Sequence, residues 1–253
     1  MCYNGSMIYE IADLKIKIDN PDVYTERAFR DYVCSEEKFD FEVSVTEKQI
    51  EAERKSQLGR QNDMTDNREN GNVREYLKSV ALFRSLCGKL PFFDRFLFHC
   101  SAVELNGKCY AFAGRSGAGK TTHSLLWLKY LAEAKILNGD KPVVGCENGR
   151  FVVYGTPWRG KEKLGVKGKA ELNGICFIEQ SKNNSIRKLT ATEVGERLFS
   201  QIYFPNDPEA AAKTLEFCDK IASKVPVYLL KCDISEEAFR LSYSALTGKG
   251  ERL

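Results

Sequence analysis

The sequence predicts an α/β protein with a mixed β-sheet, preceded by a smaller α+β part. An apolar strand over residues 108–113 runs into a glycine-rich loop, and an amphipathic helix over 120–131 follows it. Asn106-Gly107 and the segment 147–150 are typical two-residue hairpin turns on either side of this unit. A sheet of parallel strands alone has no hairpins, so a mixed sheet with flanking helices is expected.

The first part of the chain predicts a small acidic domain. Apolar and polar residues alternate towards the end of 8–18 and across 39–45, which is typical of half-buried strands, and a short helix is expected over 21–34. Thr46 with Gln49 forms a capping box for a helix over 47–56. Residues 56–72 then lose all apolar periodicity. We therefore expect an α+β domain over 1–56, a linker over 57–72 and a second domain over 73–253.

The second domain is expected to begin with a helix whose Tyr76, Val80, Phe83 and Cys87 share one face and which stops at Gly88. Three further helices follow from their caps: a Thr190/Glu193 capping box, Asp207 before Pro208, and Ser235. They are expected to end near Tyr203, Ser223 and Gly248. Besides 108–113, strands are expected over 96–103, 136–137, 143–146, 151–154, 175–178, 186–189 and 227–230.

Composition excludes several classes of protein. The chain has 253 residues, 43% of them hydrophobic, and a net charge of +3, which is too small to favour nucleic acid as a partner. The first 72 residues hold 16 acidic and 10 basic side chains, so the basic excess lies in the second domain. The nine cysteines form no CxxC pair or zinc-ligand cluster, and no signal sequence or membrane span is visible. A reducing cytoplasm is the expected location.

The glycine-rich loop carries the strongest chemical signal. Residues 114–121 fit GxxxxGK[ST] in full, between a strand and a helix. Glycines let successive backbone N–H groups converge on phosphate oxygens, and the helix N-terminus adds positive charge. Lys120 is expected to reach the β and γ phosphates, and Thr121 to offer a hydroxyl to Mg²⁺. The predicted nucleotide-binding residues are Gly114, Arg115, Ser116, Gly117, Ala118, Gly119, Lys120, Thr121 and Thr122.

Two residues outside the loop are candidates for the chemistry. In a hairpin that turns at Asn106-Gly107, the residues that face each other across the two strands have numbers that sum to 213. This register places His99 opposite Gly114. Asp140 follows the strand after the loop helix, where a Mg²⁺ ligand is needed. A satisfied structural histidine and a surface turn are the alternative interpretations. His123, inside the helix, is interpreted as structural or supporting.

The segment 159–169 is a third candidate. It contains five basic residues against Glu162 alone, with three glycines among them. Such a segment suits a lid over phosphates, in which a cation neutralises the transferring group. We assign this function to Arg159 and Lys161. A solvated surface loop explains Lys163–Lys169 equally well.

These motifs together resemble the HPr kinase/phosphorylase family of P-loop kinases. His99 precedes the loop by the interval seen there, and Asp140 takes the second position of the Asp-Asp pair that follows the loop helix. The residues 99–102 and 117–122 also resemble the kinase core of ATP-dependent phosphoenolpyruvate carboxykinase. The resemblance covers roughly residues 96–160. It implies a shared core fold, a homo-oligomer, and metal binding by His99 as well as Asp140.

The expected activity is phosphoryl transfer from ATP, with Mg²⁺, to a hydroxyl of a peptide, a protein serine or a small molecule. Gly139 stands where the family has its first Asp, the expected proton acceptor, so the base would be His99, Asp140 or a residue from elsewhere. That departure motivates the alternative of a nucleotide-binding sensor without chemistry. A carboxykinase-type lyase is a third reading, although the chain is about half the length and no oxaloacetate-binding arginines are visible.

Overall fold

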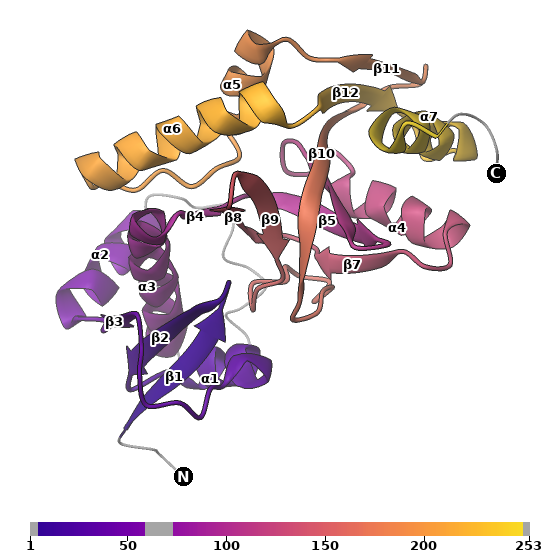
Figure 1. The fold of residues 1–253 in the computed structure, drawn as a ribbon. Helices are drawn as coiled ribbons and strands as arrows, with labels where there is room; N and C mark the ends of the chain where they lie inside the picture. The colour runs from indigo at the N-terminus through magenta and orange to yellow at the C-terminus, as the bar shows by residue number, and fades with distance from the viewer. Residues whose placement is uncertain (1–4, 59–72, 250–253) are drawn as a thin grey trace. The chain divides into compact units, whose positions relative to one another are not determined.

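The computed structural model describes residues 5–58 and 73–249, and these fall into two compact units that divide between Lys89 and Leu90 (Figure 1). Leu58 ends a helix, so nearly all of the expected linker lies outside the described residues. No helix of the described residues is long and apolar enough to cross a bilayer. The described cysteines are all free thiols.

The amino-terminal unit pairs a three-stranded sheet with three helices. A tight turn with positive φ at Ala12 and Asp13 joins β1 to β2, and β3 adds parallel to β2. The Thr46/Gln49 capping box is present. The elements are β1 (Ser6–Ile11), β2 (Leu14–Asp19), α1 (Val23–Phe29), η1 (Arg30–Tyr32), β3 (Phe41–Val43), α2 (Glu47–Leu58) and α3 (Val73–Lys89).

Helix α3 differs from its prediction in two ways. The boundary between the units lies after Lys89 rather than before residue 73, because α3 packs on α1, α2 and β3. Its buried face is Leu77, Ala81, Leu82, Leu86 and Cys87, so only Cys87 of the expected face is buried. Gly88 lies inside the helix and does not end it.

The carboxyl-terminal unit is built on a mixed nine-stranded sheet, in the path β4-β8-β9-β10-β6-β5-β7, with β12 and then β11 added beside β10. Its elements are η2 (Leu90–Phe93), β4 (Arg95–Leu97), β5 (Cys100–Leu105), β6 (Lys108–Ala113), α4 (Lys120–Tyr130), β7 (Lys135–Asn138), β8 (Val143–Glu147), β9 (Arg150–Tyr154), β10 (Lys169–Gln180), β11 (Ser185–Lys188), α5 (Ala191–Phe199), α6 (Pro208–Lys224), β12 (Val227–Cys232) and α7 (Glu236–Thr247).

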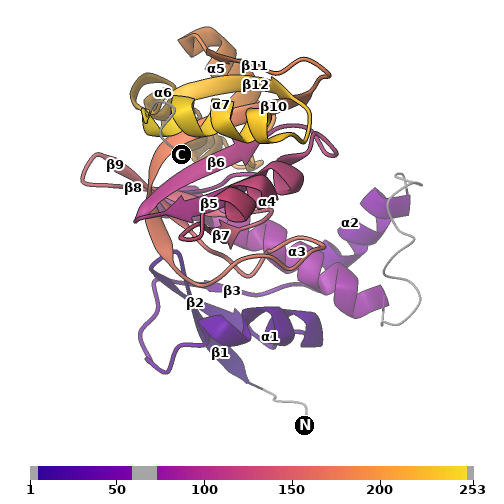
Figure 2. The same cartoon turned by 90° about the vertical axis from the view of Figure 1, so that its right-hand side faces the viewer.

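Helices cover both faces of this sheet (Figure 2). Along β6, Cys109, Ala111 and Ala113 face the core beneath α5 and α6. Tyr110 and Phe112 face the opposite core, with Trp127 of α4 and residues of α7. This alternation follows from the two-residue period of a strand and yields three layers. The expected α/β fold with a mixed sheet is confirmed.

The expected strand over 96–103 is interrupted at Phe98 and His99. Phe98 donates its N–H to Pro142 O, and His99 donates its N–H to Gln201 O, so neither amide joins the β5–β6 ladder. The ladder itself pairs Cys100 with Ala113, which is the register expected from the Asn106-Gly107 turn. His99 therefore lies just outside the strand, beside the start of the glycine loop.

Candidate functional site

The glycine-rich loop is shaped by three left-handed glycines. Gly114, Gly117 and Gly119 have φ values of 146°, 78° and 100°. A Cβ on Gly114 would lie 2.9 Å from the carbonyl oxygen of Ile178 in β10, so this position admits no side chain. Gln180, at the end of β10, donates its Nε2 to Gly117 O at 2.8 Å. The loop is thus held against β10 before α4 begins.

Lys120 curls back over this loop. Its side chain is buried, and its Nζ donates to the carbonyl oxygens of Gly114 at 2.9 Å and Arg115 at 3.2 Å. Burial lowers the pKa of Lys120, while the negative charge of Asp140 acts in the opposite direction. An ammonium group held by two carbonyls at the centre of a glycine loop is placed to meet an anion there.

The loop opens on a cavity of about 950 Å³. His99 and the loop residues Gly114, Arg115, Ser116, Gly117 and Ala118 line one side of it. Glu179 of β10, Arg197 of α5 and Gln201, which follows α5, line the other. The structure therefore brings five of the predicted loop residues and His99 to one cavity. Thr121 is half-buried in the first turn of α4, whereas Thr122 is exposed and borders a different cavity.

His99 and Asp140 meet beside the loop, as their sequence positions predict. His99 Nε2 lies 3.3 Å from Asp140 Oδ1, and Lys141 Nζ pairs with the other oxygen, Oδ2. Burial alone would raise the pKa of Asp140, but the contacts with His99 and Lys141 hold it at about 2. The carboxylate is therefore ionised at neutral pH, although only 22% of its side chain is exposed.

The turn that carries Asp140 is fixed by Asn138. Asn138 Oδ1 accepts the backbone N–H groups of Asp140 and Lys141 at 2.9 and 2.8 Å. Its Nδ2 donates to Thr156 Oγ1 at 2.9 Å, and Thr156 Oγ1 donates to Lys141 O. The site residues that the sequence analysis missed are therefore Asn138, Lys141 and Thr156. Their signal lies in the sequence itself, because Asn138 and Lys141 stand within two residues of Asp140, and Thr156 lies three residues before Arg159.

The basic segment passes directly over Asp140. Gly160 has a φ of 74°, and a Cβ there would lie 2.9 Å from Asp140 Cβ. Gly139 donates its N–H to Leu164 O at 2.9 Å, and Asn138 bridges to Gly165. Arg159 is half-buried and Lys161 is exposed. The segment 159–165 is thus anchored at the site, and its action as a lid stays a prediction.

Gly139 is needed for this packing. A Cβ at position 139 would lie 3.2 Å from both Cβ and O of Leu164. We expect Gly139→Ala and Gly139→Asp to lower the free energy of unfolding by about 1–3 kcal/mol, because the anchored segment must shift. Gly195→Ala in α5 is the matched control, since nothing lies within 4 Å of that position. Thermal unfolding measures the difference. A Gly139→Asp protein as stable as the parent and more active would contradict this account.

His123 lies behind the loop in the core. It is 3% exposed, its ring packs edge-on to Phe112 and its Nε2 lies 2.8 Å from Ser242 Oγ. Burial lowers the pKa of His123 to about 4. The neutral ring is therefore part of the packing between α4 and α7, which agrees with the supporting role expected for it.

This burial predicts acid sensitivity. The pKa of His123 is lower in the folded than in the unfolded chain, so the unfolded state binds more protons between about pH 6.5 and 4. The free energy of unfolding should fall by about 3 kcal/mol across this window as pH is lowered. Urea titrations followed by tryptophan fluorescence test this in the carboxyl-terminal unit, which holds both tryptophans, Trp127 and Trp158. A His123→Gln variant should lose this dependence, and equal slopes in both proteins would refute it.

Comparison with known proteins gives little further help. No family model matches the chain, and no curated protein matches it. Among solved structures, the HPr(Ser) kinase/phosphatase from Coxiella burnetii aligns with 60% of this chain and 94% of its own, at 11% identity and a TM-score of 0.33. A similarity at these values does not establish a shared activity. The functional assignment therefore depends on the geometry of the site.

Proposed function

We propose that this protein is a Mg²⁺-dependent phosphotransferase that moves the terminal phosphoryl group of ATP to a hydroxyl of a peptide, a protein serine or a small molecule. One observation carries the proposal: the ionised Asp140 and its partner His99 lie beside a glycine loop that holds a buried lysine. The HPr kinase-like motifs described above support the same class of reaction.

The residues present fit a nucleotide with Mg²⁺. Mg²⁺ prefers oxygen ligands and is usually held by one or two protein groups together with phosphates and water. The Asp140 carboxylate and the Thr121 hydroxyl are the groups that would hold it, and when bound it would neutralise charge on the phosphates. Loop N–H groups and Lys120 would bind the phosphates themselves. Arg159 and Lys161 would add positive charge from the segment above Asp140.

In this scheme His99 is the proton acceptor. Its Nε2 faces Asp140 Oδ1, so the carboxylate orients the ring and leaves Nδ1 for the acceptor hydroxyl. The hydroxyl oxygen forms a bond to the γ-phosphorus, its proton passes to His99 Nδ1, and the bond from the γ-phosphorus to the bridging oxygen breaks to release ADP. With Nε2 engaged by Asp140, the base role is favoured over metal ligation by His99.

Gly139 favours one alternative, a nucleotide-binding sensor without chemistry. A Cβ at position 139 would lie 3.2 Å from Leu164 O, which is tighter than an ordinary contact, so the first acid of the family's pair would fit only if the segment of Leu164 shifted. In that case Asp140→Ala and His99→Ala would leave cellular function intact, whereas Lys120→Ala would not.

An experiment with labelled ATP distinguishes the phosphotransferase from the nucleotide-binding sensor. The protein is incubated with γ-³²P-ATP, Mg²⁺ and fractionated lysate, and each fraction is examined for label. Transfer that needs both an acceptor fraction and Asp140 supports the phosphotransferase. Binding of ATP without transfer to any fraction supports the sensor. Release of carbon dioxide from oxaloacetate with ATP would instead reveal a carboxykinase-type lyase.

A further inference from the structure

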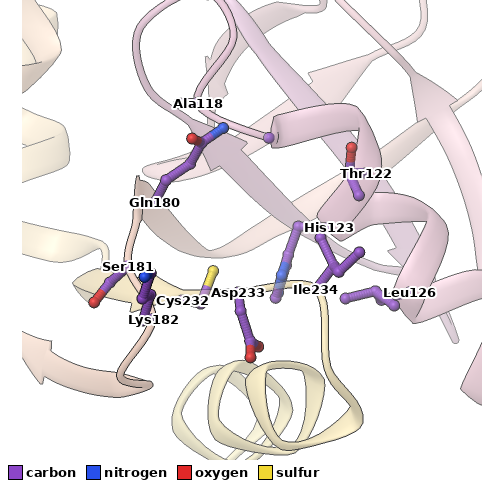
Figure 3. A pocket seen from close by; sticks show the side chains of 11 residues that line it. Ala118, Thr122, His123, Leu126, Gln180, Ser181, Lys182, Cys232, Asp233 and Ile234 are labelled. Carbon is purple, nitrogen blue, oxygen red and sulfur yellow. The ribbon is translucent and has the colours of Figure 1, made fainter.

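A second cavity, of about 550 Å³, adjoins the glycine loop and is not lined by His99 (Figure 3). Ala118, Gly119 and Thr122 contribute to it from the loop and the first turn of α4. Two other segments complete it: residues 180–182, at the end of β10, and residues 232–234, at the end of β12. The two cavities thus meet at Ala118 and Gln180, and His99 lines only the larger one.

The topology explains why a cavity forms here. Strand β10 runs parallel to both β6 and β12, so the carboxyl ends of three neighbouring strands point the same way. Those ends lead into the glycine loop after β6, into Ser181 after β10 and into Asp233 after β12. In α/β sheets the crevice outside the carboxyl ends of parallel strands is where ligands bind. A molecule held by the glycine loop therefore has room to extend across β10 and β12.

The walls of this cavity are mixed in character. Ile234 is 74% exposed, the highest fraction among the exposed large apolar residues of the described chain. Leu126 of α4 adds a second apolar wall, while Gln180, Lys182 and Asp233 supply polar groups. An apolar surface beside a few polar groups is typical of small-molecule sites. A flat ring with polar edges would cover Ile234.

His123 supplies an independent sign of a missing ligand. Its ring points from α4 towards the segment of Asp233 and Ile234 (Figure 3). Ser242 Oγ donates to Phe239 O and accepts from Trp127 Nε1, so His123 Nε2 carries the proton and donates to Ser242. Nδ1 is then an acceptor, yet it is buried and has no hydrogen-bond partner among the described residues. Buried acceptors without a partner are rare in proteins.

We propose that this cavity binds the nucleoside portion of the nucleotide. This inference rests on the proposed function, because it takes the phosphates to lie in the glycine loop. The base covers Ile234 and Leu126, and a hydroxyl or amino group of the nucleoside donates to His123 Nδ1. The ligand class is a nucleoside di- or triphosphate, recognised by its base and sugar as well as by its phosphates.

Calorimetry with two ligands tests the proposal. ADP carries both portions of the nucleotide, whereas pyrophosphate occupies only the glycine loop. Ile234→Asp should raise the Kd of ADP about tenfold or more, since a desolvated carboxylate replaces an apolar wall, and should leave the Kd of pyrophosphate unchanged. Leu215→Asp, at an equally large apolar side chain that is 49% exposed on α6, is the matched control and should change neither.

The outcomes separate the two proposals. Unchanged ADP binding in Ile234→Asp, or equal affinity of the parent protein for ADP and pyrophosphate, would overturn the nucleoside site and leave the phosphate loop standing. A Lys120→Ala variant that still binds both ligands would overturn the phosphate loop itself. Nitrogen NMR gives a second readout, because the chain has only two histidines, His99 and His123. The Nδ1 resonance of His123 should move with ADP and not with pyrophosphate; a response to neither would overturn the contact.

Discussion

Lys120→Ala is expected to lower ATP turnover by about 10²–10³-fold, which is the typical cost of removing one charge-stabilising donor from an active site. In the ligand-free protein the Lys120 ammonium bonds to the carbonyls of Gly114 and Arg115, at the place where the phosphates would lie. An anion there would replace the neutral carbonyl acceptors with negatively charged ones, which adds an ion-pair attraction to the hydrogen bonds of the ammonium group. Alanine keeps the first turn of α4 and removes only this group.

Two measurements make this expectation specific. Calorimetry should show weaker binding of both ADP and pyrophosphate, and thermal unfolding should change little, because among the described residues the Lys120 ammonium bonds to two carbonyls of its own loop. Lys129→Ala is the matched control: Lys129 is exposed near the end of the same helix, and its Nζ lies 4.9 Å from the centre of the Tyr130 ring. Loss of activity in Lys129→Ala, or full activity in Lys120→Ala, would contradict the assignment.

Local sequence signals predicted the parts of the site that depend on neighbouring residues. The Asn106-Gly107 turn fixes the register that pairs Cys100 with Ala113, and this places His99 at the loop. The glycines at 114, 117 and 119 adopt the left-handed conformations that their pattern indicates. The Thr190/Glu193 and Asp207 caps begin α5 and α6 where expected. Each of these features is decided within about twenty residues of chain.

The features that sequence reasoning missed depend on distant contacts. Asn138 meets Thr156 across 18 residues, and no short-range rule predicts that pair. The predicted strand over 96–103 breaks because the amide of Phe98 bonds to Pro142 O and that of His99 to Gln201 O. Helix α3 buries Leu77 and Leu86 instead of Tyr76 and Phe83, because its partners are α1 and α2. In each case tertiary packing overrides the local pattern.

Asp140→Asn is expected to reduce phosphoryl transfer by about 10²–10⁴-fold, the range typical of lost acid–base assistance, while ADP binding persists. Asparagine keeps the size of the side chain and the backbone contacts to Asn138, but it removes the negative charge that faces His99 and Lys141. His99 then loses the partner that orients its ring. Because the pKa of Asp140 is about 2, this charge is present at every pH used for assay.

His99→Gln tests the same pair from the other side. Glutamine retains a donor for Asp140 Oδ1 and lacks a group that accepts the hydroxyl proton, so transfer should fall while the fold and ADP binding remain. Glu133→Gln, at an exposed carboxylate before β7, is the matched control for Asp140→Asn and should retain full activity. If both site variants bind ATP and transfer phosphate at the parent rate, the pair has no catalytic role. If the parent protein also transfers no phosphate, the nucleotide-binding sensor explains the site better than the phosphotransferase.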